Sequence, residues 1–174
     1  MATAVRPSVE EVWRWLSGVP DPEIPIISLT ELGIVRDVEW REDELVVTVT
    51  PTYSGCPAMS IINVDIERAL TEKGLDKVRL ERRLSPAWTT DWITTEGREK
   101  LRTYGIAPPI DGTAADGVLM KRIDRISGRS NLTIACPRCG STNTEKVSQF
   151  GSTPCKASYR CSDCLEPFDY FKCI

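Results

Sequence analysis

The spacing of hydrophobic and polar residues changes from period two to a helical period on either side of Cys56. Residues 45–50, LVVTVT, are largely β-branched and have one purely apolar face, which predicts a strand that ends at Pro51. From residue 59 to residue 70 the apolar residues recur every three or four positions, which predicts a helix. Cys56 therefore lies in the loop that joins a strand to a helix.

The residues beside Cys56 predict that it lies at or next to the helix N-cap. Gly55 permits a tight turn, and Pro57 suits the first helical position, where a missing N–H is tolerated. Because the positive end of a helix dipole favours thiolate over thiol, one interpretation is a reactive thiol with a lowered pKa. The alternative is a small buried residue that caps a core helix.

The rest of the first half predicts an α+β domain over residues 1–105. A capping box between Ser8 and Glu11 predicts a helix over Val9–Leu16. Residues 34–40 and 45–50 alternate like the two strands of a hairpin, and residues 77–84 predict a third strand. This order favours a small sheet with helices on one face.

Between the first helix and the hairpin lies the segment DPEIPIISLTELGIV. Its prolines prevent regular strand pairing, but its apolar residues are too many for a free loop, so we expect an ordered, packed loop. Asp21 and Glu23 stand at its start on either side of Pro22. They are candidates for an acid–base pair or a cation site, and the simpler alternative, which we favour, is helix capping and solvent exposure.

Residues 85–131 combine two tryptophans, a charged helix and a linker. Trp88 and Trp92 are predicted to be a lid over the domain's own core, with a partner-binding surface as the alternative. Thr95–Tyr104 is predicted as a helix that Gly105 ends. Residues 106–131 are rich in proline, glycine, alanine and charge, and are predicted to be a linker.

The last segment, residues 132–174, holds six of the seven cysteines and is predicted to be a zinc ribbon. Two CxxC knuckles are separated by 21 residues, which suits tetrahedral binding of one zinc ion. The predicted ligands are Cys136, Cys139, Cys161 and Cys164. Because a site closed by four thiolates has no open position, the zinc is expected to be structural, and it stabilises a segment too short to fold alone.

Cys155 and Cys173 are left over from the zinc site. They are either buried hydrophobic residues or part of a second thiolate site for a soft metal or an iron–sulfur cluster, with Cys56 as a further ligand. The sequence leaves both alternatives open.

Charge and composition narrow the classes of function. The formal net charge of −3 disfavours nucleic acid as a partner, and no stretch has the apolar length of a membrane span, so we expect a cytoplasmic protein. In a reducing compartment, paired cysteines indicate metal binding rather than disulfides. The absence of histidine excludes Ser-His-Asp and Cys-His catalysis, and leaves cysteine and carboxylates as the reactive groups.

Two strings in residues 8–105, DPEIPIISLTELGIV and TPTYSGCPAM, resemble the SufT-like metal-sulfur cluster assembly domain. Members of that family carry an Asp-Pro-Glu segment and a loop cysteine before a helix, which match Asp21-Pro22-Glu23 and Cys56. The tail, CPRCGST followed by SQFGSTPCKASYRCSDCLEPFDYFKCI, resembles the phenylacetate-degradation family PaaD, also called PaaJ. This second resemblance extends along the whole chain, from the first helix to the last cysteine.

The resemblance implies an accessory member of the bacterial phenylacetyl-CoA epoxidase system, which converts an aromatic CoA thioester into its ring epoxide. Its implied partners are the di-iron oxygenase and iron–sulfur flavin reductase subunits, and a homodimer is a further option. The implied role is maturation or repair of their metal centres, with no catalytic step of its own. The resemblance does not say which group touches a cluster. Our preferred hypothesis is that the protein hands a transient iron–sulfur cluster, or makes a metal-delivery interaction, through Cys56. The alternative is a zinc-ribbon scaffold. A thiol–disulfide oxidoreductase fits less well, because each CxxC has a partner knuckle.

Overall fold

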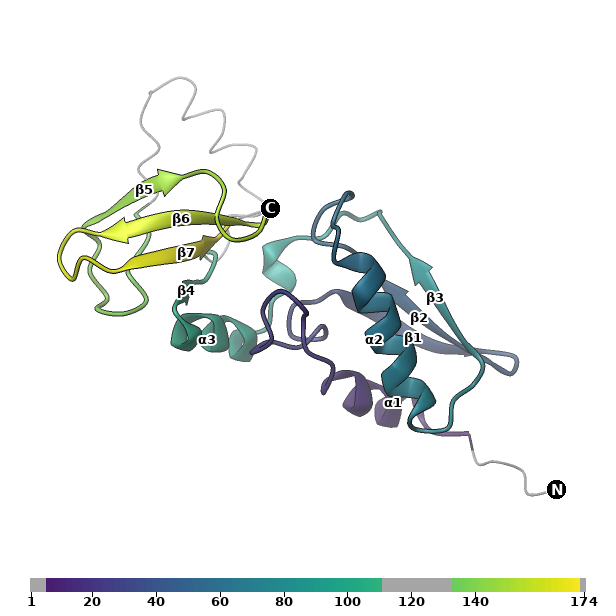
Figure 1. Ribbon diagram of the computed structural model, residues 1–174. Coiled ribbons are helices and arrows are strands. Elements are labelled where there is room, and N and C mark those ends of the chain that lie inside the picture. Colours follow the sequence, from purple (N-terminus) through teal and green to yellow (C-terminus); the bar gives the residue numbers. More distant parts are fainter. Residues whose placement is uncertain (1–5, 111–132, 173–174) are drawn as a thin grey trace. The chain divides into compact units, whose positions relative to one another are not determined.

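The computed structural model describes residues 6–110 and 133–172, which fall into two compact units, Met1–Trp88 and Thr89–Ile174 (Figure 1). No helix in the described ranges is both long enough and apolar enough to cross a membrane.

The first unit is a three-stranded sheet with two helices, and it confirms the predicted α+β class. Its helices and strands follow the predicted order along the chain. They are α1 (Val9–Leu16), β1 (Val35–Arg41), β2 (Glu44–Val49), α2 (Met59–Thr71) and β3 (Val78–Arg82).

The helix α1 begins where the sequence predicts. Ser8 accepts a hydrogen bond from the Glu11 N–H at 3.2 Å, and the Glu11 carboxylate accepts one from the Ser8 N–H at 3.0 Å. This capping box satisfies two N–H groups that the first turn otherwise leaves unpaired. Val12 and Leu16, one turn apart, are fully buried, so α1 packs one face against the rest of the unit.

The sheet has the order β1-β2-β3, with β1 and β2 antiparallel and β2 and β3 parallel. A parallel pair needs a crossover connection, and α2 provides it. The register places Val38, Val47 and Leu80 side by side on one face, which α1 and α2 cover (Figure 1). The apolar side chains on this face of β2 therefore form part of the core of this unit.

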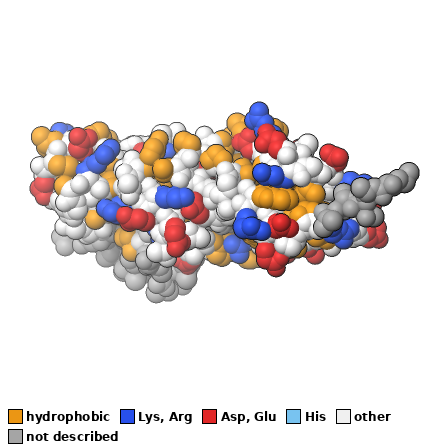
Figure 2. Space-filling model, turned by 90° about the horizontal axis from the view of Figure 1, so that it is seen from below, with side chains coloured by type: hydrophobic (Ala, Val, Ile, Leu, Met, Phe, Trp, Pro, Cys, Tyr) orange, Lys and Arg blue, Asp and Glu red, His pale blue; other side chains and the backbone are white. Residues whose placement is uncertain are grey.

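The opposite face of the sheet carries charged side chains. Arg41 pairs with Glu81 at 2.7 Å, and Arg79 pairs with Glu44 at 3.0 Å. Figure 2, which views the protein from below, shows charged side chains of both signs interspersed with hydrophobic ones on that side. Because such exposed pairs contribute little stability, the charged face serves mainly to cover the sheet.

The loop between α1 and β1 is ordered and packed, as predicted. The Leu29 N–H donates to the Val19 carbonyl at 3.0 Å, which closes the loop at its base. Four of its aliphatic side chains are almost completely buried: Ile24, Ile27, Leu29 and Leu32. Trp88 is also buried and donates its indole N–H to the Leu32 carbonyl at 2.9 Å, which agrees with the predicted lid over the core.

The second unit contains a short helix, an α-helix and a four-stranded sheet. The elements are η1 (Thr90–Trp92), α3 (Thr95–Tyr104), β4 (Ile106–Ala107), β5 (Thr144–Ser148), β6 (Lys156–Cys161) and β7 (Pro167–Phe171). The sheet order is β4-β7-β6-β5. Trp92 is half-buried.

The structure differs from the predicted linker at its first residues. Ile106 and Ala107 are buried and form β4, which pairs in parallel with β7. Residues 111–131 of that linker lie outside the described ranges. Arg98 stabilises this part of the second unit by donating hydrogen bonds to the carbonyls of Pro109 and Thr90 at 2.6 and 2.7 Å.

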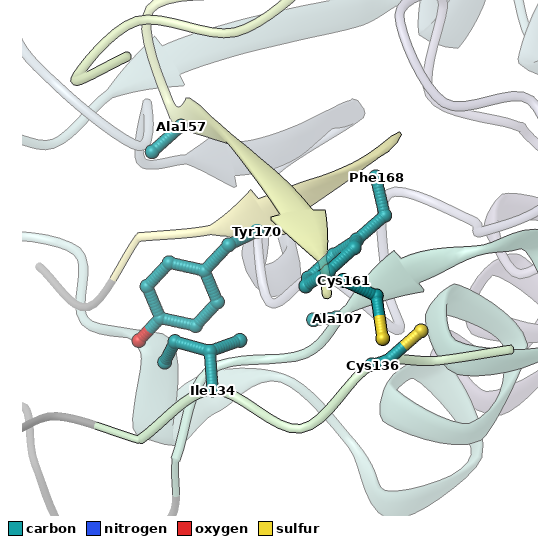
Figure 3. Packing of buried hydrophobic residues seen from close by; sticks show 7 residues of the cluster. All are labelled: Ala107, Ile134, Cys136, Ala157, Cys161, Phe168 and Tyr170. Carbon is teal, nitrogen blue, oxygen red and sulfur yellow. The ribbon is translucent and has the colours of Figure 1, made fainter. Parts of the chain in front are cut away.

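A small core lies beside the sheet of the second unit (Figure 3). Its buried members are Ala107, Ile134, Cys136, Ala157, Cys161, Phe168 and Tyr170. Two of these seven residues are cysteines of the knuckles, so the core and the candidate metal site share residues. A core of this size cannot supply much stability alone, which agrees with a need for bound metal.

Candidate functional site

Four cysteine sulfurs converge at one end of the second unit. The Sγ atoms of Cys136, Cys139, Cys161 and Cys164 all lie within 4.8 Å of one another. Cys136 and Cys161 are buried, whereas Cys139 and Cys164 are exposed. In the described ranges this is the one group of three or more cysteine or carboxylate ligands that could hold a metal ion.

The two knuckles have closely similar turns. In the first, the Cys136 N–H donates to the Ser141 carbonyl at 2.8 Å, and Gly140 has a φ of 75°. In the second, the Cys161 N–H donates to the Glu166 carbonyl at 3.0 Å, and Leu165 has a φ of 64°. These left-handed residues reverse the chain, so each knuckle presents both of its thiols to the same point.

Asp163 links the two knuckles outside the sulfur cluster. Its carboxylate accepts a hydrogen bond from the Asn143 amide at 2.8 Å and another from the Ser141 hydroxyl. Both bonds lower the pKa of Asp163. The sequence analysis did not identify this contact, although the acidic residue inside the second knuckle was a signal for it.

The backbone of the second knuckle favours a thiolate at Cys161. The N–H groups of Cys164 and Asp163 point at its sulfur and lower its pKa to about 7, against the effect of burial. The neighbouring Cys164 differs: a hydrogen bond from the Glu166 N–H lowers its pKa, but burial and the thiols of the other cysteines outweigh this bond and raise the pKa to about 12. A thiol must lose its proton to bind a metal ion, so Cys161 is the thiol of this knuckle that is prepared for metal binding near neutral pH.

The sulfur geometry fits a tetrahedral zinc ion. With zinc–sulfur bonds of about 2.3 Å, a tetrahedral site places its sulfurs about 3.8 Å apart. The Cys136 and Cys164 sulfurs are 3.7 Å apart, and the Cys139 and Cys161 sulfurs are 3.6 Å apart. The four residues that the sequence predicts thus form a compact group that could hold a metal ion.

Cys155 lies apart from this group. It is buried, and its sulfur lies 3.0 Å from the hydroxyl of Thr153. Its carbonyl accepts a hydrogen bond from the Lys172 N–H at 3.0 Å. Cys173 lies outside the described residues, and Cys56 belongs to the first unit, so the second thiolate site stays a prediction.

Cys56 lies further from the start of the helix than the predicted position at or next to the N-cap. The N-cap of α2 is Ala58, and the Cys56 N–H donates to the Tyr53 carbonyl at 3.1 Å, within a turn that precedes the helix. Cys56 is thus two residues before the cap. The effect of the helix dipole decreases steeply with distance from the first turn, so it stabilises this thiolate less than expected.

The surroundings of Cys56 raise its pKa, which contradicts the expected lowered value. Burial is the largest cause, and the negative charges of Glu23 and Asp21 add to it. Hydrogen bonds from the Ala58 N–H and the Thr52 hydroxyl oppose these effects without reversing them. The thiol is therefore protonated near neutral pH and becomes a thiolate most easily when a cation replaces the proton.

Asp21 acts both as a turn cap and as a charged neighbour of Cys56. It is buried, and its Oδ1 atom accepts hydrogen bonds from the N–H groups of Glu23 and Ile24 at 2.9 and 2.8 Å. These bonds hold the carboxylate in place. The structure therefore brings together Asp21, Glu23 and Cys56, which are far apart in the sequence.

The fold and the two cysteine sites define a protein that combines an iron–sulfur assembly domain with a zinc ribbon. Residues 9–79 match the family described as iron–sulfur cluster assembly protein, and residues 123–172 match the family described as PaaD zinc beta ribbon domain.

A relative along the whole chain defines the family. The chain is 47% identical over 174 residues, which is 98% of the relative, to a protein of Escherichia coli (strain K12) whose name describes a putative subunit of 1,2-phenylacetyl-CoA epoxidase. The chain therefore belongs to the PaaD family of epoxidase subunits.

Other relatives match the first domain. An "Fe-S protein maturation auxiliary factor" of Porphyromonas gingivalis (strain ATCC BAA-308 / W83) is 33% identical over 94 residues, which are 53% of this chain and 89% of that protein. A crystal structure of a domain of unknown function, DUF59, from Bacillus anthracis covers 53% of this chain and 89% of that chain, with 25% identity and a TM-score of 0.49.

Proposed function

We propose that this protein is an accessory maturation factor of a phenylacetyl-CoA epoxidase system, and that it carries an iron–sulfur cluster transiently on Cys56. The observation that carries the proposal is the position of Cys56 beside Asp21 and Glu23 in the domain that matches iron–sulfur assembly proteins. The names of the relatives, an epoxidase subunit and an Fe-S maturation factor, support the same role. The oxygenase and reductase subunits are the proposed partners.

The raised pKa of Cys56 supports transient rather than permanent binding. When a thiol keeps its proton near neutral pH, that proton competes with the metal for the sulfur, so the cluster is held weakly. In the transfer step the bond from iron to Cys56 breaks, and a bond from iron to a client cysteine forms. The proton of the client thiol passes to Cys56, and iron and sulfide keep their oxidation states.

One thiolate cannot hold a cluster alone. Iron–sulfur clusters are held by four ligands, usually cysteines, so further ligands must come from the client or from a second copy of the chain in a homodimer. Asp21 and Glu23 are proposed to attract the iron and to accept the proton that Cys56 releases when iron binds. The free thiols suit the reducing cytoplasm, which is the proposed location.

The proposed role of the second unit is structural. Cys136, Cys139, Cys161 and Cys164 are the proposed zinc ligands, and zinc is the proposed resident metal. When bound, the zinc ion would cross-link the two knuckles. Its four thiolate ligands would leave no open coordination position for chemistry. Asp163 holds the knuckles together from outside through Ser141 and Asn143.

The test is anaerobic reconstitution of the purified chain with iron and sulfide, followed by measurement of iron, sulfide and zinc. We expect the wild-type chain to take up transferable iron and sulfide, and we expect Cys56→Ser to lose this uptake while it keeps its zinc. Equal uptake by both proteins would show that Cys56 is not the carrier.

A second candidate function is a zinc-ribbon scaffold that holds the oxygenase complex together. Three large apolar side chains of the second unit are more than 60% exposed, namely Val147 at 64%, Phe150 at 68% and Leu165 at 62%. Exposed apolar side chains are typical anchors for a partner protein. A chain that binds zinc, takes up no iron and still binds the epoxidase subunits would favour this function.

A further inference from the structure

The helix α3 is too short and too polar to form by itself. It has ten residues, of which Gly97 and Leu101 are buried. Isolated helices of fewer than about 12–15 residues are marginal in water, and a glycine inside a helix weakens it further. The strand β4 follows α3 directly after Gly105 and has two residues. Both elements therefore depend on the groups against which they pack.

The groups that hold β4 carry the candidate metal site. The strand pairs in parallel with β7. Its second residue, Ala107, lies in the small core that also contains Cys136 and Cys161 (Figure 3). Residues 107–110 and 133–140 line one cavity, so the chain that follows α3 and the first knuckle face each other. The order of β4 is thus tied to the order of the cysteines.

Arg138, which stands between the two cysteines of the first knuckle, contacts the end of α3. A Cβ atom added at Gly105 would lie 3.2 Å from the Nη2 atom of Arg138 and 3.4 Å from its Cζ atom, so the guanidinium lies over the Gly105 backbone. Gly105 is the C-cap of α3, with a φ of 100°, and its N–H donates to the Arg102 carbonyl at 3.1 Å. A cation at this end of a helix is stabilised by the negative pole of the helix dipole.

We propose that Arg138 is a positioning residue of the metal site, and that α3 and β4 fold together with the zinc-bound knuckles. The inference rests on the proposed zinc site and does not involve Cys56. When zinc is bound, the knuckles fix Arg138 and the shared core, and these hold Gly105 and β4 in place. In return, Arg138 holds the first knuckle against the end of α3, which slows the opening that releases zinc.

The part of the chain that depends on zinc therefore begins well before the first cysteine of the knuckles. Without metal, the shared core loses its support, and α3 loses both the Arg138 contact and the strand that follows it. Arg98 extends this dependence toward the N-terminus, because it bonds the carbonyls of Thr90 and Pro109 at 2.7 and 2.6 Å. Zinc occupancy thus decides whether residues 95–110 are helix and strand or unfolded chain.

Hydrogen exchange of the full-length chain, with zinc bound and after removal of zinc by a strong chelator, tests how far this dependence extends. We expect the amides of α3 and β4 to lose their protection together with those of β6 and β7, because all four share the metal-bearing core. The amides of α1 and α2 serve as the internal control and should keep their protection. Protection of α3 in the metal-free chain would overturn the inference.

The rate of zinc release to a chelator tests Arg138 itself. We expect Arg138→Gln to release zinc about two- to fivefold faster than the wild type, as the interaction of a cation with a helix C-terminus implies. Arg160→Gln is the matched control, because Arg160 is also exposed and also adjoins a metal-site cysteine, Cys161. Its neighbours across the sheet are Glu145 and Pro167, so it should release zinc at the wild-type rate. Equal acceleration by both variants would reduce the effect to a loss of positive charge near the thiolates and overturn the role of Arg138.

A double-mutant cycle separates this contact from a general loss of stability. Gly105→Ala strains the backbone and displaces the guanidinium, so it should also speed zinc release. Because the contact is already lost in Arg138→Gln, Gly105→Ala should accelerate release less in that variant than in the wild type. Independent, additive effects in a chain that holds zinc would overturn only this inference. A wild-type chain that holds no zinc would refute the proposed zinc site and this inference with it, whatever Cys56 does.

Discussion

Leu165 occupies in the second knuckle the left-handed conformation that Gly140 occupies in the first, with φ values of 64° and 75°. Glycine adopts this conformation freely, whereas a residue with a side chain pays about 1 kcal/mol or more for it. Leu165 is 62% exposed, so burial does not compensate for the strain. The two knuckles therefore have the same backbone but different local stability.

This relationship predicts effects of different size for two substitutions. Gly140→Ala should lower the free energy of unfolding of the zinc-loaded chain by about 1 kcal/mol, because an added Cβ meets nothing within 4 Å and only the φ of 75° is strained. Leu165→Gly should change it little, because relief of strain is offset by the greater freedom of glycine in the unfolded chain. Thermal unfolding of both variants checks this, and a neutral Gly140→Ala would contradict it.

Removal of the metal should unfold the second unit and leave the first intact. The small core of the second unit shares Cys136 and Cys161 with the metal site, so loss of the ion leaves both the knuckles and the core unsupported. After treatment with a strong chelator, limited proteolysis should cleave within residues 133–172 and spare residues 6–88. Resistance of residues 133–172 after verified metal removal would argue against the structural zinc.

Much of the first unit could be predicted because its signals are local. The capping box at Ser8, the alternation in β2 and the helical spacing from Met59 depend on neighbouring residues, and α1 begins and ends where predicted. The same holds for α3 of the second unit. The strand β4 could not be found this way. It has two residues, too few for a period, and its partner in β7 lies more than sixty residues further along the chain.

In the candidate sites, too, local patterns were predictable, whereas contacts between distant residues were not. The CxxC spacing is a local pattern that already contains the turn geometry, so the four-cysteine group was predictable. The pKa of Cys56 was not, because it depends on burial and on carboxylates more than thirty residues away. Lys156 is a further example: it is buried and pairs with Asp169 at 3.5 Å, which no spacing in the sequence indicates.

The surplus cysteines should be dispensable for zinc. Cys155 lies outside the four-sulfur group and makes its contact with the Thr153 hydroxyl, so the double substitution Cys155→Ser/Cys173→Ser should leave one zinc per chain. If a second soft-metal site exists, the same variant should lose activity in the reconstitution assay. Zinc analysis of the variant is the check, and a fall in zinc content would show that the ligand set is different.

The raised pKa of Cys56 predicts a pH-dependent stability. The thiol of a cysteine in the unfolded chain has a pKa of about 8.5. In the folded chain, Cys56 keeps its proton to higher pH. The folded state therefore binds more protons above pH 8.5 or so, and the free energy of unfolding should fall as the pH rises through this range. Unfolding of the zinc-loaded wild type and Cys56→Ser, compared across this range, should show the steeper fall in the wild type. Equal slopes would refute the raised pKa.

Alkylation of Cys56 provides an independent measure of the same pKa. Only the thiolate reacts, so the rate at Cys56 in the zinc-loaded chain should still rise at a pH where an unfolded cysteine has levelled off. Peptide mapping separates Cys56 from the other cysteines. A rate that levels off below pH 8.5 or so would restore the lowered pKa that the sequence analysis expected.

Cys56→Ser should separate folding from function. Cys56 is half-buried in a turn, its N–H donates to the Tyr53 carbonyl, and serine is close enough in size to keep this turn. We therefore expect the melting temperature to change little, since the α2 cap is Ala58 and is not altered. Serine cannot replace the thiolate, because its hydroxyl stays protonated near neutral pH and is a poor ligand for iron–sulfur clusters. Epoxidase activity and the metal content of the oxygenase and reductase should fall in cells that carry only the variant. Cells with normal activity, together with an unchanged melt, would reduce Cys56 to a structural turn residue and favour the zinc-ribbon scaffold.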